Sequence, residues 1–307
     1  MDGSDSAGWS LTVDPGSDGQ RLDRFLATRI ARLSRARAAR LEVIDLDDPS
    51  RVFKKSATVH AGQRLFVRRP LPDGDVTPPA PRVLHEDADL LVLDKPAGLA
   101  VHPTASRYVA TVTHWLAQRA AEALPPEPVH RLDVETSGVL LCARHGMANR
   151  VLKGLFAEAR VHKTYWAVVE GQPPDAWEAD TPLGFADDSA VRLKMGPGDK
   201  PARTAFCTLQ RGPRRALIEA RPLTGRQHQI RAHLALGGHP IVGDKLYGPD
   251  EALFLAALER PLTEDEVGRL GHGRQALHAR RAEFDWRGRP QRFEAPWPTE
   301  LAVLVHR

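Results

Sequence analysis

The residues best suited to chemistry lie in one short stretch, His130 to Gly138, which reads HRLDVETSG. It places a carboxylate, Asp133, two residues after a cation, Arg131, and ahead of two hydroxyl groups. A continuous apolar run follows at residues 139–143 and predicts a short buried strand, so the stretch is a loop anchored to a core strand. Loops fixed by rigid strands often carry catalytic residues. A carboxylate held there could attack an electrophilic carbon or stabilise positive charge on it.

A simpler interpretation of the same stretch is a turn in which the Asp133 side chain accepts hydrogen bonds from nearby backbone N–H groups. Spacing alone favours that turn, because short motifs also match by chance. The choice between the two interpretations therefore depends on the rest of the chain.

Two later stretches place aromatic and basic side chains on regular elements. Residues 163–171 (KTYWAVVEG) are rich in aromatic and β-branched residues and predict a strand that carries Tyr165. Residues 222–234 (PLTGRQHQIRAHL) predict a helix that is capped by Thr224, carries Arg231 and ends at the glycines at 237 and 238. The histidines at 228, 233 and 239 lack HExxH spacing and an acid on the same helix, so no metal site is predicted.

The surrounding body of the chain predicts both strands and helices. Residues 89–103 predict a strand, a Pro-Gly turn and a second strand. The simplest interpretation is a hairpin with Lys95 exposed, and no chemical role is assigned to Lys95 or His102. The other predicted elements are helices at 111–123 and 147–160, loops with a hairpin over 175–200, strands at 205–209 and 215–220, inserted helices at 251–258 and 264–270, and closing strands at 277–286 and 292–298.

Length and composition fit a folded protein of one large or two modest domains, since 42% of the 307 residues are hydrophobic. No apolar stretch approaches the length of a membrane span, and residues 1–8 lack the basic and apolar parts of a secretory signal. Cys142 and Cys207 lie far apart in strand-like runs and are expected to be buried free thiols. There is no CxxC pair for a zinc site. These features predict a cytoplasmic protein.

Positive charge is concentrated near the N-terminus. From Arg21 to Arg69 there are thirteen Lys or Arg and five Asp or Glu, a net charge of +8, whereas the whole chain carries +4. A basic module joined to a mildly acidic body predicts a polyanionic partner, although such arginines also fit a solvated helix face. The module would hold a helix over 22–33, a second helix from Ser34, and strand-like pieces at 51–53 and 64–67.

The residue types in several stretches favour the catalytic interpretation of residues 130–138 over the simple turn. HRLDVETSG resembles the signature HRLD-x-x-TSG of the RluA-type RNA pseudouridine synthases, and residues 163–171 resemble that family's K-x-Y-x-A-x-V-x-G motif. The strings TGRQHQIRAHL (224–234) and GHPIVGDKLYG (238–248) resemble a third motif. The similarity runs from about Gly19 to Leu304, nearly the whole chain.

The resemblance implies roles for individual residues. Asp133 would be the nucleophile and Arg231 its ion-pair partner. Tyr165 would lie against the target uracil, where its phenol could also relay a proton, and Ile230 would line the same pocket. Arg131 would fill the space left by the flipped nucleotide. Two further residues are predicted to bind substrate, Arg226 and His228.

The basic module resembles the small two-helix RNA-binding module of a ribosomal small-subunit protein and of tyrosyl-tRNA synthetases. Its predicted RNA-binding residues are Arg29, Arg32, Arg35, Arg37 and Arg40. The module departs from that pattern at residues 41–49, where aspartates replace the usual Gly-x-Val-x-Val-Asn-Gly hairpin and would repel phosphate.

The fold implied by the resemblance is α+β: a mixed, mainly antiparallel curved sheet with a central catalytic cleft, plus a small N-terminal α/β RNA-binding module. The domains would be a flexible tail (1–17), the RNA-binding module (18–70), a Pro- and Gly-rich linker (71–81) and the catalytic domain (82–307). A short leading strand over residues 9–13 is an alternative to the tail.

The implied activity is isomerisation of uridine to pseudouridine in structured RNA, with 23S-type large-subunit rRNA preferred because ribosomal members often carry the module. The reaction conserves the number of bonds, so no cofactor is expected. The partner would be rRNA, free or in a pre-ribosomal particle, and the enzyme a monomer without membrane contact. Three alternatives stay open: a tRNA pseudouridine synthase, a non-catalytic RNA-binding or assembly factor, and a hydrolase with an aspartate nucleophile.

Overall fold

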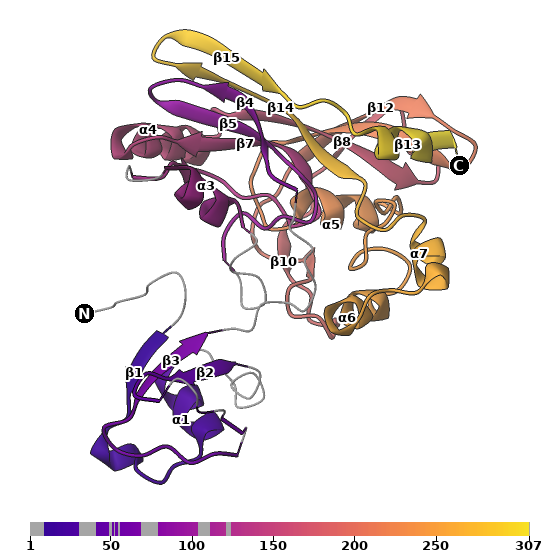
Figure 1. Cartoon of the computed structure of the whole chain (residues 1–307). Helices are drawn as coiled ribbons and strands as arrows, with labels where there is room; N and C mark the ends of the chain where they lie inside the picture. The colour runs from indigo at the N-terminus through magenta and orange to yellow at the C-terminus, as the bar shows by residue number, and fades with distance from the viewer. Residues whose placement is uncertain are drawn as a thin grey trace. The chain divides into compact units, whose positions relative to one another are not determined.

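The computed structural model of the chain describes residues 9–30, 41–48, 51, 53–54, 56–68, 79–103, 111–120 and 124–306 (Figure 1). The chain divides into two units, one with residues 1–77 and 104–109 and the other with residues 78–103 and 110–307. The predicted linker lies outside the described residues except at 79–81, so the predicted domain limits around it stay predictions.

The first unit is built on a three-stranded antiparallel sheet. Its described elements are β1 (Trp9–Thr12), the 3-10 helix η1 (Pro15–Ser17), α1 (Leu22–Arg29), β2 (Glu42–Asp45) and β3 (Arg64–Arg68). The strands lie in the order β1-β3-β2. Phe25 and Leu26 of α1 are fully buried against Leu65 of β3, so the apolar face of the helix closes a small core of its own.

Residues 9–17 are part of this unit, so the flexible tail predicted over 1–17 is wrong for them, and the alternative of a short leading strand is confirmed by β1. β1 pairs with β3 from Trp9↔Val67 to Thr12↔Arg64, and Val13 is buried in the core. A short run of β-forming residues is more stable when it pairs with β3 than as an unpaired chain end. The strand-like piece at 51–53 does not form a strand at its described positions, 51 and 53.

The second unit is organised around a ten-stranded sheet. The strands of this unit are β4 (Arg82–Glu86), β5 (Leu90–Lys95), β6 (Glu127–Pro128), β7 (Ser137–Ala143), β8 (His162–Glu170), β9 (Ala176–Ala179), β10 (Leu183–Phe185), β11 (Met195–Pro197), β12 (Thr204–Arg211), β13 (Arg215–Pro222), β14 (Leu277–Trp286) and β15 (Arg289–Glu294). The main path is β4-β5-β7-β14-β8-β13-β12-β9, with β6 added to β7 and β15 to β14, while β10 and β11 form a separate pair.

The sheet is mixed and mainly antiparallel, which confirms the predicted α+β class. The parallel pair joins β7 and β14, and it extends only over His278↔Ser137 and Ala279↔Gly138. β7 and β14 therefore begin at the same edge of the sheet and run in the same direction. The HRLD loop, residues 130–136, leads directly into β7, so it lies at this central junction of the sheet.

Helices cover both faces of the central strands. The helices of the second unit are α3 (Val112–Ala120), α4 (Gly146–Ala157), α5 (Gln229–Leu236), α6 (Ala252–Glu259), α7 (Glu264–Leu270), α8 (Thr299–Ala302) and the 3-10 helix η2 (Val303–His306). Along β7, Val139 and Leu141 pack with α4, whereas Leu140 and Cys142 pack with α3. Because side chains alternate along a strand, α3 and α4 lie on opposite faces, and Figure 1 shows α3 and α5 beneath the sheet.

A predicted strand and a predicted buried thiol of this unit are wrong. Residues 98–102 do not form a second strand after the Pro-Gly turn, because only an isolated bridge from Ala100 to Thr111 pairs them. Cys142 is buried as expected, but Cys207 is exposed, since β12 presents alternate side chains to solvent. No helix in the described ranges is long and apolar enough to cross a membrane.

Gly138 is the residue that lets β7 and β14 approach so closely. Its φ is +110°, a conformation that favours glycine. A Cβ atom built at this position would lie 2.2 Å from the Ala279 carbonyl oxygen of the paired strand. Gly138 is therefore required by both its backbone conformation and the space beside it.

We expect Gly138→Ala to lower the free energy of unfolding by roughly 2–6 kcal/mol, the sum of backbone strain and overpacking. The matched control is Gly154→Ala in α4, where a new Cβ atom meets nothing within 4 Å and helix propensity predicts a gain of roughly 0.5–1 kcal/mol. Urea unfolding followed by circular dichroism measures both variants. A Gly138→Ala protein as stable as wild type would contradict this account of the junction.

Candidate active site

The backbone around Asp133 is held by the turn that follows β5. The Gly98 N–H donates to the Val134 carbonyl at 2.8 Å, and the Asp133 carbonyl accepts from the Thr136 N–H at 3.1 Å. The HRLD loop is thus a tight turn, as the simpler interpretation expected. However, its backbone groups close the turn themselves, and the Asp133 carboxylate points to other partners.

Lys95 braces this turn from inside the protein. Its side chain is fully buried, and Nζ donates to the carbonyls of Pro96, Leu99 and Val134 at 2.8, 2.8 and 3.2 Å. Three acceptors match the three N–H groups of an ammonium ion. Burial lowers the pKa of Lys95 to about 7, although the nearby charge of Asp133 opposes the shift. The simplest interpretation of this hairpin, with Lys95 exposed, is wrong, because β5 is covered on both faces.

The other side of the turn is held by residues just before β14. Gln275 donates from its backbone N–H to a Glu135 carboxylate oxygen at 3.1 Å and from its side-chain amide to the Thr136 hydroxyl at 2.7 Å. Lys245 donates to the other Glu135 oxygen at 2.5 Å. Segments distant in sequence thus fix the backbone on both sides of Asp133, as a reacting group requires.

Arg231 of α5 joins two carboxylates. Its Nη1 donates to Asp133 Oδ2 at 2.8 Å, while Nε and Nη2 form a two-pronged pair with Asp244 at 2.7 and 2.8 Å. Asp244 is fully buried and also accepts the backbone N–H groups of Leu246 and Tyr247 at 3.0 Å. Asp244 therefore fixes the guanidinium, and the guanidinium fixes Asp133.

Asp133 is the partly exposed member of this group, with 23% of its side chain accessible, compared with 9% for Arg231 and none for Asp244. Burial would raise the pKa of the Asp133 carboxyl, but the charge and hydrogen bond of Arg231 lower it below the ordinary value. Two carboxylates share one guanidinium, so the group carries a net negative charge. That charge reaches the surface at Asp133, which is ionised at neutral pH.

His228 faces the second oxygen of Asp133. It precedes α5 with a left-handed φ of +52°, and its Nε2 lies 3.8 Å from Asp133 Oδ1. Burial lowers the pKa of His228 to about 4, so the ring is neutral at pH 7. The Tyr247 hydroxyl accepts from the Met195 N–H at 2.8 Å and shares a second hydrogen bond with His228 Nδ1 at 3.2 Å, so Tyr247 fixes the orientation of the His228 ring.

Tyr165 and Ile230 pack against the same apolar cluster beside this group. Tyr165 lies on β8 opposite Ala220 and Ala279, and Ile230 directly precedes Arg231 on α5. Burial, and then the charge of Asp133, raises the pKa of the Tyr165 hydroxyl well above its usual range, so the phenol stays protonated. An apolar ring and an isoleucine beside an anionic carboxylate suit a flat base attached to a sugar.

Two other residues predicted to bind substrate form no ion pair with Asp133 within the described residues. Arg226 is exposed and donates from Nε to the Pro201 carbonyl at 2.9 Å, and Arg131 is exposed beside a separate hollow. Thr224 does not cap α5, because the residue before that helix is His228; its hydroxyl instead donates to the Gln229 side chain. Among the described residues, no group of His, Cys, Asp and Glu is arranged to hold a metal ion.

Of the RNA-binding arginines predicted in the basic module, Arg29 is the one that lies within the described residues, and its predicted contact with RNA stays a prediction. Arg29 is exposed and pairs with Asp14, and the other predicted RNA-binding arginines, at 32, 35, 37 and 40, lie outside the described residues. Two of the aspartates expected to repel phosphate are ion-paired, Asp47 with Arg64 at 2.6 Å and Asp45 with Arg51 at 3.5 Å. Repulsion by this segment is weaker than the sequence suggests.

Sequence reasoning missed four residues that support the site: Lys95, Asp244, Tyr247 and Gln275. Asp244 and Tyr247 stand in the string GDKLYG, which resembles a family motif but carried no assigned role. An acid flanked by glycine and lysine could have been paired with the buried arginine of α5. No signal in one sequence marks Gln275, since its role depends on where β14 meets β7.

Comparison with known proteins agrees with this geometry. The sequence pattern of the RNA pseudouridylate synthase family matches residues 89–236. An uncharacterized RNA pseudouridine synthase of Chloroflexus aurantiacus is 36% identical, over 96% of this chain and 92% of the relative. A ribosomal large subunit pseudouridine synthase D of Zymomonas mobilis is 34% identical, over 93% of each chain.

Solved structures show the same architecture. The human RNA pseudouridylate synthase domain containing 4 superposes with a TM-score of 0.58 and is 28% identical, covering 73% of this chain and 91% of its own. Sequence, fold and site therefore agree: the chain belongs to the RNA pseudouridine synthases, the enzymes that isomerise uridine in RNA to pseudouridine.

Proposed function

We propose that this enzyme isomerises uridine in large-subunit rRNA and that Asp133 is its nucleophile. Several of the relatives, including that of Zymomonas mobilis, are named for the ribosomal large subunit, which supports the choice of substrate. The observation that carries the assignment of Asp133 is its 2.8 Å contact with Arg231, which keeps a partly exposed carboxylate ionised. We propose that the enzyme acts as a monomer in the cytoplasm, on free rRNA or on an assembling particle.

The reaction detaches uracil from ribose and reattaches it through another atom. The N1–C1′ bond breaks, the base turns, a C5–C1′ bond forms, the C5 proton leaves and N1 gains a proton. The cleavage step leaves electron deficiency at C1′, and the Asp133 carboxylate attacks that carbon or stabilises its positive character. No bond is lost overall, so the chemistry needs no oxidant and no nucleotide triphosphate.

The neighbouring residues hold the base while it is detached. Tyr165 and Ile230 form the apolar wall against which the uracil turns, and burial of the site excludes water that would otherwise capture the sugar. His228 Nε2 lies 3.8 Å from Asp133 Oδ1, and in the tautomer protonated at Nε2 it would donate to a substrate oxygen beside that carboxylate. Arg231 is a positioning residue in this scheme, because both of its partners are protein carboxylates.

The first test measures tritium release from RNA labelled at uracil C5, with unmodified large-subunit rRNA and bulk tRNA compared side by side. We expect release from rRNA by the wild type and release at background level by Asp133→Asn, which keeps the shape and removes the charge. Asp187→Asn, at an exposed aspartate, is the matched control and should match wild type.

The arms of this test separate the parts of the proposal. Release from tRNA alone would overturn the substrate and leave the chemistry in place. Release that survives in Asp133→Asn would overturn the nucleophile. If the wild type releases no tritium from either RNA but still binds RNA, a particle substrate or a non-catalytic assembly role would be favoured.

A second prediction concerns pH. Activity requires ionised Asp133, whose pKa lies below its ordinary value because of Arg231, so kcat/KM of the wild type should decline only below about pH 4. In Arg231→Met, burial raises the pKa of Asp133 without an opposing positive charge. The acid limb of the kcat/KM profile should therefore move up by about 1–3 pH units. The pH profile of tritium release under kcat/KM conditions measures the shift.

Asp244→Asn is the comparison for this pH shift. It removes a buried partner of Arg231 and should cost roughly 3–5 kcal/mol of stability, yet it leaves the arginine charge next to Asp133. Its acid limb should therefore not move upward. An Arg231→Met enzyme that keeps the wild-type acid limb, while still folded by circular dichroism, would exclude the electrostatic role of Arg231.

A further inference from the structure

The isomerisation removes a proton from uracil C5, and the base that accepts this proton has to reach that carbon. The proton leaves after the new C5–C1′ bond has formed, when C1′ has just parted from the Asp133 carboxylate. A base for this step must therefore lie beside Asp133, on the side that the substrate can reach.

The ionisable groups around Asp133 differ in their capacity to accept a proton. The Arg231 guanidinium has no acceptor atom, and the Tyr165 phenol stays protonated because burial raises its pKa well above the usual range. Lys95 lies beneath the turn, with its ammonium group donating to three backbone carbonyls. His228 combines a neutral, basic ring with a position against the carboxylate.

The backbone at His228 has an uncommon conformation that places this ring. Its φ is +52°, in the left-handed region that few residues other than glycine adopt. The other described non-glycine residues with a positive φ, Ala159 and Arg287, lie in turns. At His228 the side chain is 11% exposed, and Nε2 lies 3.8 Å from Asp133 Oδ1. Uncommon backbone conformations cluster at functional sites, so we attribute this one to the placement of the ring.

Tyr247 supports the His228 ring in either protonation state. A hydroxyl group can both donate and accept, so the 3.2 Å contact between Tyr247 and Nδ1 suits a bare nitrogen as well as an N–H group. When the ring proton lies on Nδ1, Nε2 has a lone pair available beside Asp133. Burial disfavours the charged ring and lowers the pKa of His228, whereas the negative charge of Asp133 favours the charged ring. Asp133 is an anion again once C1′ has left it.

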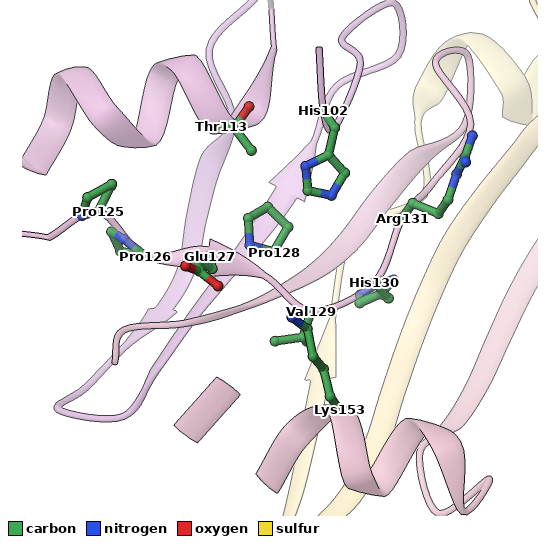
Figure 2. A pocket seen from close by; sticks show the side chains of 10 residues that line it. All are labelled: His102, Thr113, Pro125, Pro126, Glu127, Pro128, Val129, His130, Arg131 and Lys153. Carbon is green, nitrogen blue, oxygen red and sulfur yellow. The ribbon is translucent and has the colours of Figure 1, made fainter. Parts of the chain in front are cut away.

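Two other histidines, in and near the HRLD loop, are engaged elsewhere. His130 Nε2 accepts the Leu141 N–H at 3.0 Å, and burial lowers the pKa of His130 to about 3. His102 lines a hollow of about 510 Å³ at the start of the loop, and Figure 2 shows its ring directed at the Pro128 side of that hollow. Asp133 is not among the residues that line the hollow. His228 is thus the histidine of the three that is placed against the reacting carboxylate.

We propose that His228 is the base that takes the C5 proton, through Nε2. The C5–H bond breaks and its electron pair forms the C5–C6 double bond, while the N1–C6 double bond of the intermediate becomes a single bond as N1 gains a proton. The His228 imidazolium gives its proton to N1 or to water, so one proton leaves the base, one arrives, and the ring returns to its neutral form. This step rests on the proposed role of Asp133 in holding C1′.

Two variants of His228 test this role, together with a matched control. His228→Gln keeps a hydrogen-bonding amide in place of the ring and removes the basic nitrogen. His228→Gly accommodates the positive φ and leaves space for added imidazole. The control is His162→Gln, at an exposed histidine of β8. Single-turnover rates of pseudouridine formation are measured on RNA that carries hydrogen or deuterium at uracil C5, and circular dichroism checks that each variant is folded.

We expect the rate of His228→Gln to fall by about 10²–10⁴-fold, the usual contribution of a general base. Proton removal then limits the rate, so deuterium at C5 should slow this variant by a primary isotope effect. Added imidazole should restore part of the rate of His228→Gly. His162→Gln should match wild type with either isotope.

A rate of His228→Gln near that of wild type would overturn the proposal and leave Asp133 itself to accept the proton. A slow His228→Gln enzyme without an isotope effect would also overturn it, because the ring would then orient Asp133 or the substrate for cleavage of the N1–C1′ bond. Should His228→Gln not fold, His228→Gly decides: an isotope effect in the slow variant supports the proposal, and its absence overturns it.

Failure of this proposal can be distinguished from failure of the proposed function. The experiment uses whichever of rRNA or tRNA the wild type modifies, so the choice of substrate does not affect the outcome. Asp133→Asn judges the nucleophile, and an active Asp133→Asn enzyme would remove the basis of both proposals. Active wild type, inactive Asp133→Asn and an unimpaired His228→Gln would overturn the base alone. If the wild type modified neither RNA, both proposals would be overturned for these RNAs.

Discussion

The buried ion group of Asp133, Arg231 and Asp244 is the interaction on which the site depends. Moving ions from water into protein costs several kcal/mol for each, and the cost is offset only when every donor and acceptor has a partner. Here Arg231 uses Nε, Nη1 and Nη2, and Asp244 also takes two backbone N–H groups. With Asp244 satisfied inside, the remaining negative charge stays on Asp133, the one member that solvent and substrate can reach.

This ion group can act only if the backbone beneath Asp133 does not move. The necessary rigidity comes from the junction of β7 and β14, where Gly138 lies against the Ala279 carbonyl and no side chain could separate the strands. Lys95 holds the turn from the β5 side, and Gln275 holds it from the β14 side. A displacement of about 1 Å can cost two orders of magnitude in rate. Residues that fix the backbone beneath Asp133 can therefore affect the rate without touching the substrate.

The sequence predicted what local pattern determines and missed what tertiary contact determines. Strand β8, the helical pair α6 and α7, and strand β14 follow directly from composition and periodicity, and the HRLD string identified Asp133. The start of α5 was predicted four residues early, because Thr224 looks like a cap while His228 adopts a left-handed conformation. The simple hairpin interpretation of residues 89–103 left Lys95 in solvent. Only the fold shows that both faces of β5 are covered and that three carbonyls surround its ammonium group.

The arrangement of charge around the HRLD loop also constrains how an RNA strand can lie on it. The Asp133 carboxylate is anionic and repels phosphate, so a polyanion approaching this surface would be turned away unless its phosphates had a better place nearby. The sugar–base junction is the uncharged part of a nucleotide, so it can approach an ionised Asp133 at the lowest electrostatic cost. The charge that Arg231 keeps on Asp133 therefore favours a substrate orientation in which the phosphates lie away from this carboxylate.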